Sequence, residues 1–458
     1  MAALNERKIA IVRTLVETAP DKVVGGLQAA LAETGADTAL GGVRRLVEAE
    51  VRERTLRNLV LQPIVPMCVG GGDDPRRLTF PSKALGHVWR ALRLSHGETI
   101  ARVQTDLDEQ APVHTIMAAF DDLSAAAVAG LRAAATPDDL AALAACDQGR
   151  PGGGEMFVAC LDIAPVVRRA TQRLPEWLAH PGGETSAAAR LAYKDAVAIS
   201  EDSGPRFFEM LAAQMAQPWM VLRVISAVMD KPTERYLRDS ELAGFGEHLL
   251  ADIDASLSAI GALKADDGPG AGQEAARRAD LVVQQILEVE TSLDLQREQG
   301  WGQRVFKQRA SLAAVVEGRL REAEKAAIEA LPTHTPRQQR VRRPAPRLSD
   351  PPQDKLVNRA MTLLSFSDEL RSTANYGGFS STRNKLIEKL GEHLDHYVEE
   401  VLELIRTDEC ESLENAQAFL EIAARCNQHI RGDKAAEIVR RRAHAATCPD
   451  PPAMAAEG

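Results

Sequence analysis

Aromatic residues are scarce in this sequence, where Phe, Trp and Tyr together make up 4% of 458 residues. Long runs of β-branched residues are scarce as well, and Ala and Leu dominate the apolar set. Ala and Leu enter a helix at little cost in free energy, whereas strands favour Val, Ile and aromatic residues. The composition therefore predicts an all-α protein, and the length of the chain predicts several domains, which we expect to be helical bundles.

Paired cysteine motifs are absent. No two of the six cysteines have C-x-x-C spacing, which excludes a zinc ribbon and a thioredoxin-like redox motif. Scattered thiols in a long chain are typical of free cysteines in a reducing cytosol, so we expect a cytoplasmic protein. The six residues are Cys68, Cys146, Cys160, Cys410, Cys426 and Cys448.

Long apolar runs are missing too. No stretch offers the roughly 20 uncharged apolar residues that a transmembrane helix needs. The N-terminus carries charges at Glu6, Arg7, Lys8 and Arg13, and it lacks the apolar core of a secretory signal. Both observations agree with a cytoplasmic location.

Catalytic motifs are also absent. The sequence contains no P-loop, no G-x-G-x-x-G turn and no G-x-S-x-G elbow. The glycine runs Gly70–Gly72 and Gly152–Gly154 are each followed by acidic residues that would repel a phosphate group, which favours loops between helices. We therefore predict no cofactor, and the missing motifs favour a protein that is not an enzyme.

Glycine, proline and charge divide the chain into five segments. In the first segment, glycine pairs such as Gly25-Gly26 and several prolines are predicted to separate short to medium helices. The segments are an irregular α-helical domain at 1–230, a helical region with a long αα-hairpin at 231–331, a Pro/Arg-rich linker at 332–353, a three-helix bundle at 354–447 and a disordered tail at 448–458.

Two periodic stretches predict the αα-hairpin. Apolar residues recur with helical spacing along each stretch, and Gln299–Gly302 breaks the pattern between them. Another helix is expected before the hairpin, from Asp230 to about Ala262. The apolar residues of the hairpin are Val282, Ile286, Val289 and Leu293, then Val305, Leu312, Val316, Leu320 and Ala323.

The C-terminal bundle is predicted to contain helices at 355–372, 382–406 and 413 to about 444. Apolar residues of the middle helix repeat at near 3.5-residue spacing, which indicates a seam that packs against another helix. We predict that this seam binds a protein partner or a second copy of the chain. The seam residues are Ile387, Leu390, Leu394, Val398, Val401 and Ile405.

The same middle helix holds a weak candidate for a metal site. His393, His396 and Glu400 lie close together along it, and di-metal bundles use Glu-x-x-His motifs on facing helices. No second helix carries a matching motif, and the seam directs His396 away from the core. A solvated polar face is therefore favoured over a metal-dependent enzyme, and we predict no metal.

The Pro/Arg-rich segment is basic in a chain whose formal net charge is −10. The overall charge argues against a general role in coating nucleic acid, but a local basic segment can bind nucleic acid or an anionic membrane surface. The segment lacks interleaved aromatic residues for base stacking, and it could equally lie on acidic helices of this chain. Its arginines are Arg337, Arg340, Arg342, Arg343 and Arg347.

The most apolar stretch runs from Phe207 to Met229. Met and aromatic residues together can form an adaptable binding groove. A buried pair of helices, bent at Pro218, is favoured because long apolar surfaces rarely stay exposed.

Three functions are open from the sequence. The favoured one is a non-enzymatic cytoplasmic scaffold or adaptor that acts through helix–helix interactions, with self-association included. The alternatives are a module that binds an anionic ligand through the basic segment, and a metal-dependent enzyme.

Overall fold

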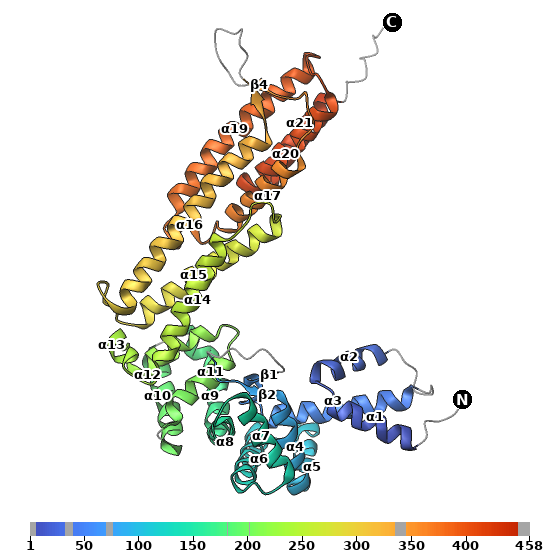
Figure 1. Ribbon diagram of the computed structural model, residues 1–458, viewed down its shortest axis with the longest axis vertical. Helices are drawn as coiled ribbons and strands as arrows, with labels where there is room; N and C mark the ends of the chain where they lie inside the picture. Colours follow the sequence, from blue (N-terminus) through green and yellow to red (C-terminus); the bar gives the residue numbers. More distant parts are fainter. Residues whose placement is uncertain are drawn as a thin grey trace. The chain divides into compact units, whose positions relative to one another are not determined.

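The computed structural model describes residues 6–32, 40–69, 77–180, 182–200, 202–334 and 345–447. These ranges contain 21 α-helices, two short 3-10 helices and four strands of two residues each (Figure 1). The predicted all-α fold is confirmed. None of the helices in these ranges is both long and apolar enough to cross a membrane.

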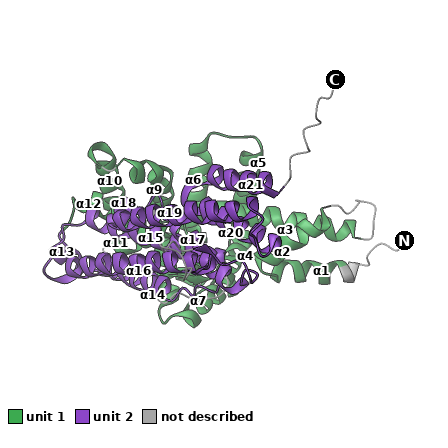
Figure 2. Ribbon diagram, turned by 90° about the horizontal axis from the view of Figure 1, so that it is seen from above, with its two compact units in different colours: residues 1–232 green, residues 233–458 purple. Residues whose placement is uncertain are grey.

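The chain forms two compact units, residues 1–232 and residues 233–458 (Figure 2). Unit 1 comprises α1 (Glu6–Thr18), α2 (Asp21–Leu31), α3 (Gly41–Val60), η1 (Val65–Met67), β1 (Cys68–Val69), β2 (Phe80–Pro81), α4 (Ser82–Ser95), α5 (Gly97–Asp108), α6 (Val113–Ala133), α7 (Pro137–Gly149), α8 (Gly153–Asp162), α9 (Ala164–Ala179), α10 (Gly183–Ile199), α11 (Ser203–Ala213), η2 (Pro218–Met220) and α12 (Val221–Met229). Strands β1 and β2 pair in parallel.

The few aromatic residues contribute to the core of unit 1. Phe80 on β2 and Phe157 on α8 meet edge to face with ring centroids 5.1 Å apart, and the centroids of Phe207 and Phe208 on α11 are 5.5 Å apart. All four side chains are buried. The stretch 207–229 supplies α11 and α12 to this core, so its favoured interpretation as a buried pair of helices is confirmed.

Two side-chain devices fix helix ends in unit 1. At the start of α7, Thr136 Oγ1 accepts the backbone N–H of Asp139, and the Asp139 carboxylate accepts the backbone N–H of Thr136. At the end of α3, buried Arg168 from α9 donates to the carbonyl oxygens of Leu59 at 3.3 Å and Val60 at 2.7 Å. Arg168 thereby attaches the C-terminal end of α3 to α9.

Unit 2 contains nine described helices and one antiparallel pair of strands. Its elements are α13 (Glu234–Arg238), α14 (Ala243–Gly261), α15 (Pro269–Ser292), α16 (Gly300–Ala330), β3 (Thr333–His334), β4 (Ala345–Pro346), α17 (Asp354–Glu369), α18 (Ala374–Gly377), α19 (Ser380–Arg406), α20 (Leu413–Arg431) and α21 (Asp433–Thr447).

Helix α17 lies at the centre of unit 2. Every residue from Ala360 to Ser367 is buried, because α15, α16 and α20 pack around this helix. Helix α15 approaches α17 closely at Gly272, where an added Cβ would clash with the carbonyl oxygen of Thr362. The predicted hairpin and the helices at 354–447 therefore pack together in one unit.

Two predicted helices are wrong in their extent. The helix expected to end at about Ala262 is interrupted at residues 239–242, so that α13 and α14 are separate. The helix expected to run from Leu413 to about His444 is interrupted at Gly432. The φ of Gly432 is 92°, in the left-handed region that glycine adopts without strain. This single residue lets α21 fold back onto α20.

The segment predicted as a linker joins two helices of the same unit. Thr333 and His334 pair in antiparallel register with Pro346 and Ala345, so the two ends of the segment lie side by side. Residues 335–344 between them lie outside the described residues. Helix α16 before this segment and α17 after it pack against each other.

Candidate functional site

The first two helices expose several large apolar side chains. Helices α1 and α2 both pack on α3 (Figure 1). On α1, Ile11 and Leu15 are 54% and 62% exposed, and on α2, Val23 and Leu27 are 49% and 39% exposed. The members of each pair are four residues apart and so share one face of their helix. Four of the 17 large apolar side chains that are exposed in the described ranges lie on these 24 helical residues.

Helix α2 contributes little to any core. Val24 is its one buried residue. The glycine pair Gly25-Gly26, predicted to separate helices, lies inside α2, so that prediction is wrong. An added Cβ at either glycine would meet no atom within 4 Å, which means that open space lies beside both. We call Ile11, Leu15, Val23 and Leu27 the N-terminal apolar residues.

Arg54 on α3 satisfies the polar groups where α1 meets α2. Its guanidinium donates to Asp21 Oδ1 at 2.5 Å and to the carbonyl oxygens of Val16 at 2.9 Å and Glu17 at 3.2 Å. Arg57 donates to the other Asp21 oxygen at 2.7 Å. A cation at the end of α1 and a carboxylate at the start of α2 both suit the helix dipoles. The charged groups of this joint are thus paired within the chain, while the N-terminal apolar residues face solvent.

The seam predicted to bind a partner lies inside unit 2. Its four central residues are at most 3% exposed, because α16, α20 and α21 pack against α19. Its two end residues are half-buried. The central residues are Leu390, Leu394, Val398 and Val401, and the end residues are Ile387 and Ile405. A partner could reach the centre of the seam only if the bundle opened.

The weak metal candidates on α19 do not form a cluster. His396 Nδ1 lies 3.8 Å from the Glu400 carboxylate in a partly exposed pair. His393 is half-buried, and burial, followed by the charge of His396, lowers its pKa below the ordinary value. Within the described ranges, no group of three or more His, Cys, Asp or Glu residues is arranged to hold a metal ion. The pair His396–Glu400 is of the kind that adds little stability.

The second glycine run begins a helix. Gly152 adopts a φ of 72° at the start of α8, and Asp147 Oδ1 accepts the backbone N–H of Gly154 at 2.8 Å. This carboxylate occupies the position at the helix N-terminus that a bound phosphate would take. The first glycine run, Gly70–Gly72, lies outside the described residues.

Of the five arginines predicted to bind an anionic ligand, Arg347 is the one within the described ranges. Its Nη2 donates to Asp350 Oδ2 at 2.7 Å, which partly neutralises its charge. The other four, Arg337, Arg340, Arg342 and Arg343, lie outside the described residues. Their predicted role stays a prediction.

One polar cluster could not be found from the sequence. His87 Nδ1 on α4 lies 2.8 Å from Asp138 Oδ1 on α7, and the same oxygen accepts from Arg90 Nε at 3.1 Å. Burial raises the pKa of Asp138, but the hydrogen bonds from His87 and Arg90 outweigh burial and hold that pKa below its ordinary value. His87 and Asp138 are 51 positions apart, so no local motif signals their contact. The cluster ties α4 to α7.

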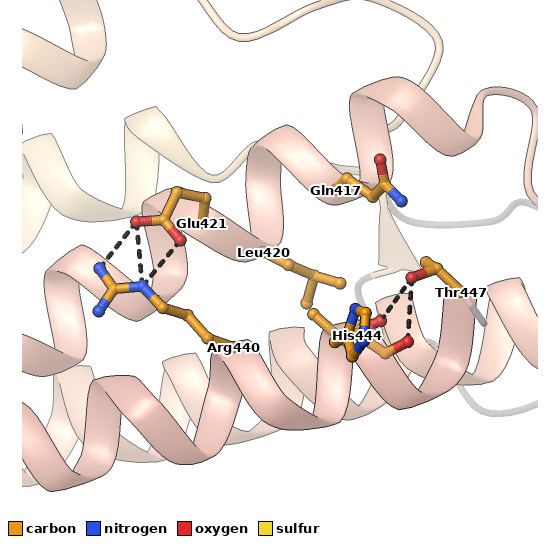
Figure 3. A pocket seen from close by; sticks show the side chains of 7 residues that line it. Gln417, Leu420, Glu421, Arg440, His444 and Thr447 are labelled. Carbon is orange, nitrogen blue, oxygen red and sulfur yellow. Dashed lines mark hydrogen bonds and ion pairs between the residues drawn. The ribbon is translucent and has the colours of Figure 1, made fainter.

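A groove of about 320 Å³ lies between α20 and α21 (Figure 3). Glu421 and Arg440 form an ion pair at one end, with the closest nitrogen and oxygen 2.8 Å apart, and His444 and Thr447 lie at the other end. Because Arg440 and Glu421 are paired with each other, they offer little to a charged ligand. The lining residues are Gln417, Leu420, Glu421, Arg440, Ala443, His444 and Thr447.

The buried cysteines are chemically unreactive at neutral pH. Burial raises the pKa of Cys146, Cys160 and Cys426 to about 12. A thiol with such a pKa stays protonated, whereas the thiolate is the nucleophile. All five cysteines within the described ranges are free. These three thiols therefore serve as small core residues.

Comparison with known proteins identifies no relative. No family model matches the chain, and no curated protein or solved structure is detectably similar to it. The function has to be inferred from the surfaces of the chain itself.

Proposed function

We propose that this chain is a non-enzymatic scaffold or adaptor that binds a protein partner through helix–helix contacts at α1 and α2. The supporting observation is the exposure of the N-terminal apolar residues on two helices that pack on α3. Covering exposed apolar surface with another apolar face lowers the free energy. Exposed apolar side chains that gather in one region are typical of interaction sites.

The chemistry of α2 indicates the kind of partner. Gly25 and Gly26 leave open space, so another helix can approach the backbone of α2 closely. Val23 and Leu27 lie four residues apart on one face of α2, which gives a ridge that a partner helix can pack against. We expect the partner to present an amphipathic helix with apolar residues at i and i+4 spacing.

The double substitution Leu15→Gln with Leu27→Gln tests this proposal. We expect the affinity for the partner to fall by about tenfold to a hundredfold, because two apolar contacts are replaced by polar groups. The measurement is co-purification from the native host at near-physiological salt, with retained proteins identified and the mass of the complex determined by light scattering.

The matched control is Leu94→Gln on α4. Leu94 is the most exposed large apolar side chain of the described residues, at 79%. This control should keep the partner that the double variant loses. A partner retained equally by both variants would contradict the proposal, as would a wild-type chain that stays monomeric and partner-free.

A second candidate is the binding of a nucleic acid or an anionic membrane surface through residues 335–344. Support comes from the sequence, which places four arginines among the ten residues between His334 and Ala345. Substituting Arg340, Arg342 and Arg343 by Gln should lower the salt concentration at which the chain elutes from immobilised polyanion. Binding that is insensitive to salt, or absent in the wild type, would exclude this candidate.

A further inference from the structure

The contact between α3 and the two preceding helices has a small apolar core. Val16 on α1, Val24 on α2 and Val47 on α3 are its buried members, each at most 5% exposed. Helix α1 has 13 residues and α2 has 11, and helices this short are marginal in water unless they are packed. The partly buried residues around this core are Val12, Ala19, Leu31, Val43 and Val51.

Arg54 provides a second attachment at the joint between α1 and α2. Its side chain contacts all three helices, since it bonds Glu50 in α3, the last carbonyl groups of α1, and Asp21 at the start of α2. Arg54 is buried, at 8% exposed. A buried charge is stable only while it keeps its partners, so these bonds hold the joint together.

The C-terminal end of α3 is attached elsewhere. Arg168 donates to the carbonyl oxygens of Leu59 and Val60, and its Nε lies 3.1 Å from Asp121 on α6. Helix α3 is therefore fixed to α6 and α9 independently of α1 and α2. Residues 33–39, which join α2 to α3, lie outside the described residues.

We infer that α1 and α2 form a flap that opens from α3, with Arg54 as the latch that holds both helices closed. Opening uncovers Val43, Val47 and Val51, which follow each other at four-residue intervals along one face of α3. The flap thus controls how much apolar surface this part of unit 1 offers. The inference concerns the chain alone and does not depend on the proposed function.

Hydrogen exchange of the full chain, followed by mass spectrometry, tests the flap. In the wild type, we expect the amides of residues 6–32 to exchange at least about tenfold faster than the buried amides of α8 and α9, because the flap opens without global unfolding. Arg54→Met keeps the apolar stem and removes the guanidinium group. It should raise exchange in residues 6–32 by about tenfold and leave α8 and α9 unchanged.

Arg52→Met is the matched control, because Arg52 is an exposed arginine two positions earlier on α3. This variant should leave the exchange rates unchanged both in residues 6–32 and in α8 and α9. Asp21→Asn is the second test, since the Asp21 side chain is 56% exposed and its substitution buries no new polar group. For this variant, we expect the rate of amide exchange to rise by about threefold in residues 6–32 and nowhere else.

Three results would overturn the inference. One is exchange in residues 6–32 that is as slow as in α8 and α9 of the wild type. Another is an equal response to Arg54→Met and Arg52→Met. The third is an Asp21→Asn chain in which the amides of residues 6–32 exchange at the wild-type rate, or in which exchange rises across the whole of unit 1. In either case, Arg54 would not act as the latch of a separate flap.

Discussion

Helices α2 and α17 place similar apolar sequences in opposite environments. Helix α17 buries all of AMTLLSFS, residues 360–367, whereas α2 buries one residue of VVGGLQAAL, residues 23–31. The neighbours make the difference, because α15, α16 and α20 surround α17 while α2 packs on α3. Burial is a property of the packing around a helix and cannot be read from one segment. An apolar helix without such neighbours keeps apolar side chains exposed to water.

The largest expected effect comes from removing a leucine from α17. Leu364→Ala leaves a cavity in the core and should lower the free energy of unfolding by about 3 kcal/mol. The same change on α2, Leu27→Ala, should lower it by less than about 0.5 kcal/mol, because this side chain already contacts water. Urea unfolding followed by circular dichroism measures both changes in the free energy of unfolding. Equal losses in the two variants would contradict the difference in burial between α17 and α2.

Two glycine substitutions should have effects of opposite sign. Gly272→Ala places a methyl group against the Thr362 carbonyl oxygen, and it should lower the free energy of unfolding by about 2 kcal/mol. Gly25→Ala adds a methyl group in open space and should stabilise α2 by up to about 1 kcal/mol. Thermal unfolding of each variant measures the sign. Destabilisation by Gly25→Ala would mean that other atoms of the chain lie within 4 Å of the added methyl group.

Alkaline pH should destabilise the cores, which hold cysteines, and not α1 to α3, which hold none. Burial raises the pKa of Cys160 and Cys426 to about 12, whereas an unfolded thiol has a pKa of about 8.5. The stability that each protonated thiol contributes is therefore fully present below about pH 8.5 and is lost as pH rises towards about 12.

We expect each of these thiols to lower the free energy of unfolding by up to about 1.4 kcal/mol per pH unit in that range. Urea unfolding at pH 8 and pH 10 gives the change in the free energy of unfolding per pH unit. Cys160→Ala and Cys426→Ala should each make this change smaller. A slope that neither substitution changes would show that other groups cause the alkaline loss.

The smallest effect is a difference in labelling rate between two buried cysteines. Cys160 should react with iodoacetamide near pH 8 only through global unfolding, because it is buried and protonated. In a Val24→Cys chain, the new thiol should react at least about tenfold faster, because opening of α1 and α2 exposes it. Peptide mass spectrometry measures both rates in one sample. Equal rates would mean that α2 opens only together with the whole unit.

Helix positions were largely predictable because periodicity is local. The sequence predicts the middle helix of the C-terminal bundle at 382–406, and the helix spans Ser380–Arg406. The errors lie where one residue decides a boundary. Gly432 separates α20 from α21, although the helical pattern of apolar residues continues on both sides of this glycine. The pattern alone therefore predicts one helix. Gly25-Gly26 has the opposite outcome, since this pair stays within α2.

The exposed apolar surface is harder to predict than the helices, for a physical reason. A periodic apolar seam has the same sequence whether the helix that covers it belongs to the same chain or to another. The seam from Ile387 to Ile405 is covered by α16, α20 and α21. The sequence does not reveal the N-terminal apolar residues, because their exposure depends on which faces of α1 and α2 no other helix covers.

The sequence by itself determined that this chain is helical, because the hydrogen bonds of a helix join residues four positions apart and depend on local composition. The tertiary structure alone decided which apolar faces are buried and which charges are paired. Arg168 bonds the carbonyl oxygen of Val60 across 108 positions, and His87 meets Asp138 across 51. Contacts over such separations arise only when whole helices pack, and this packing leaves α1 and α2 with apolar faces in water.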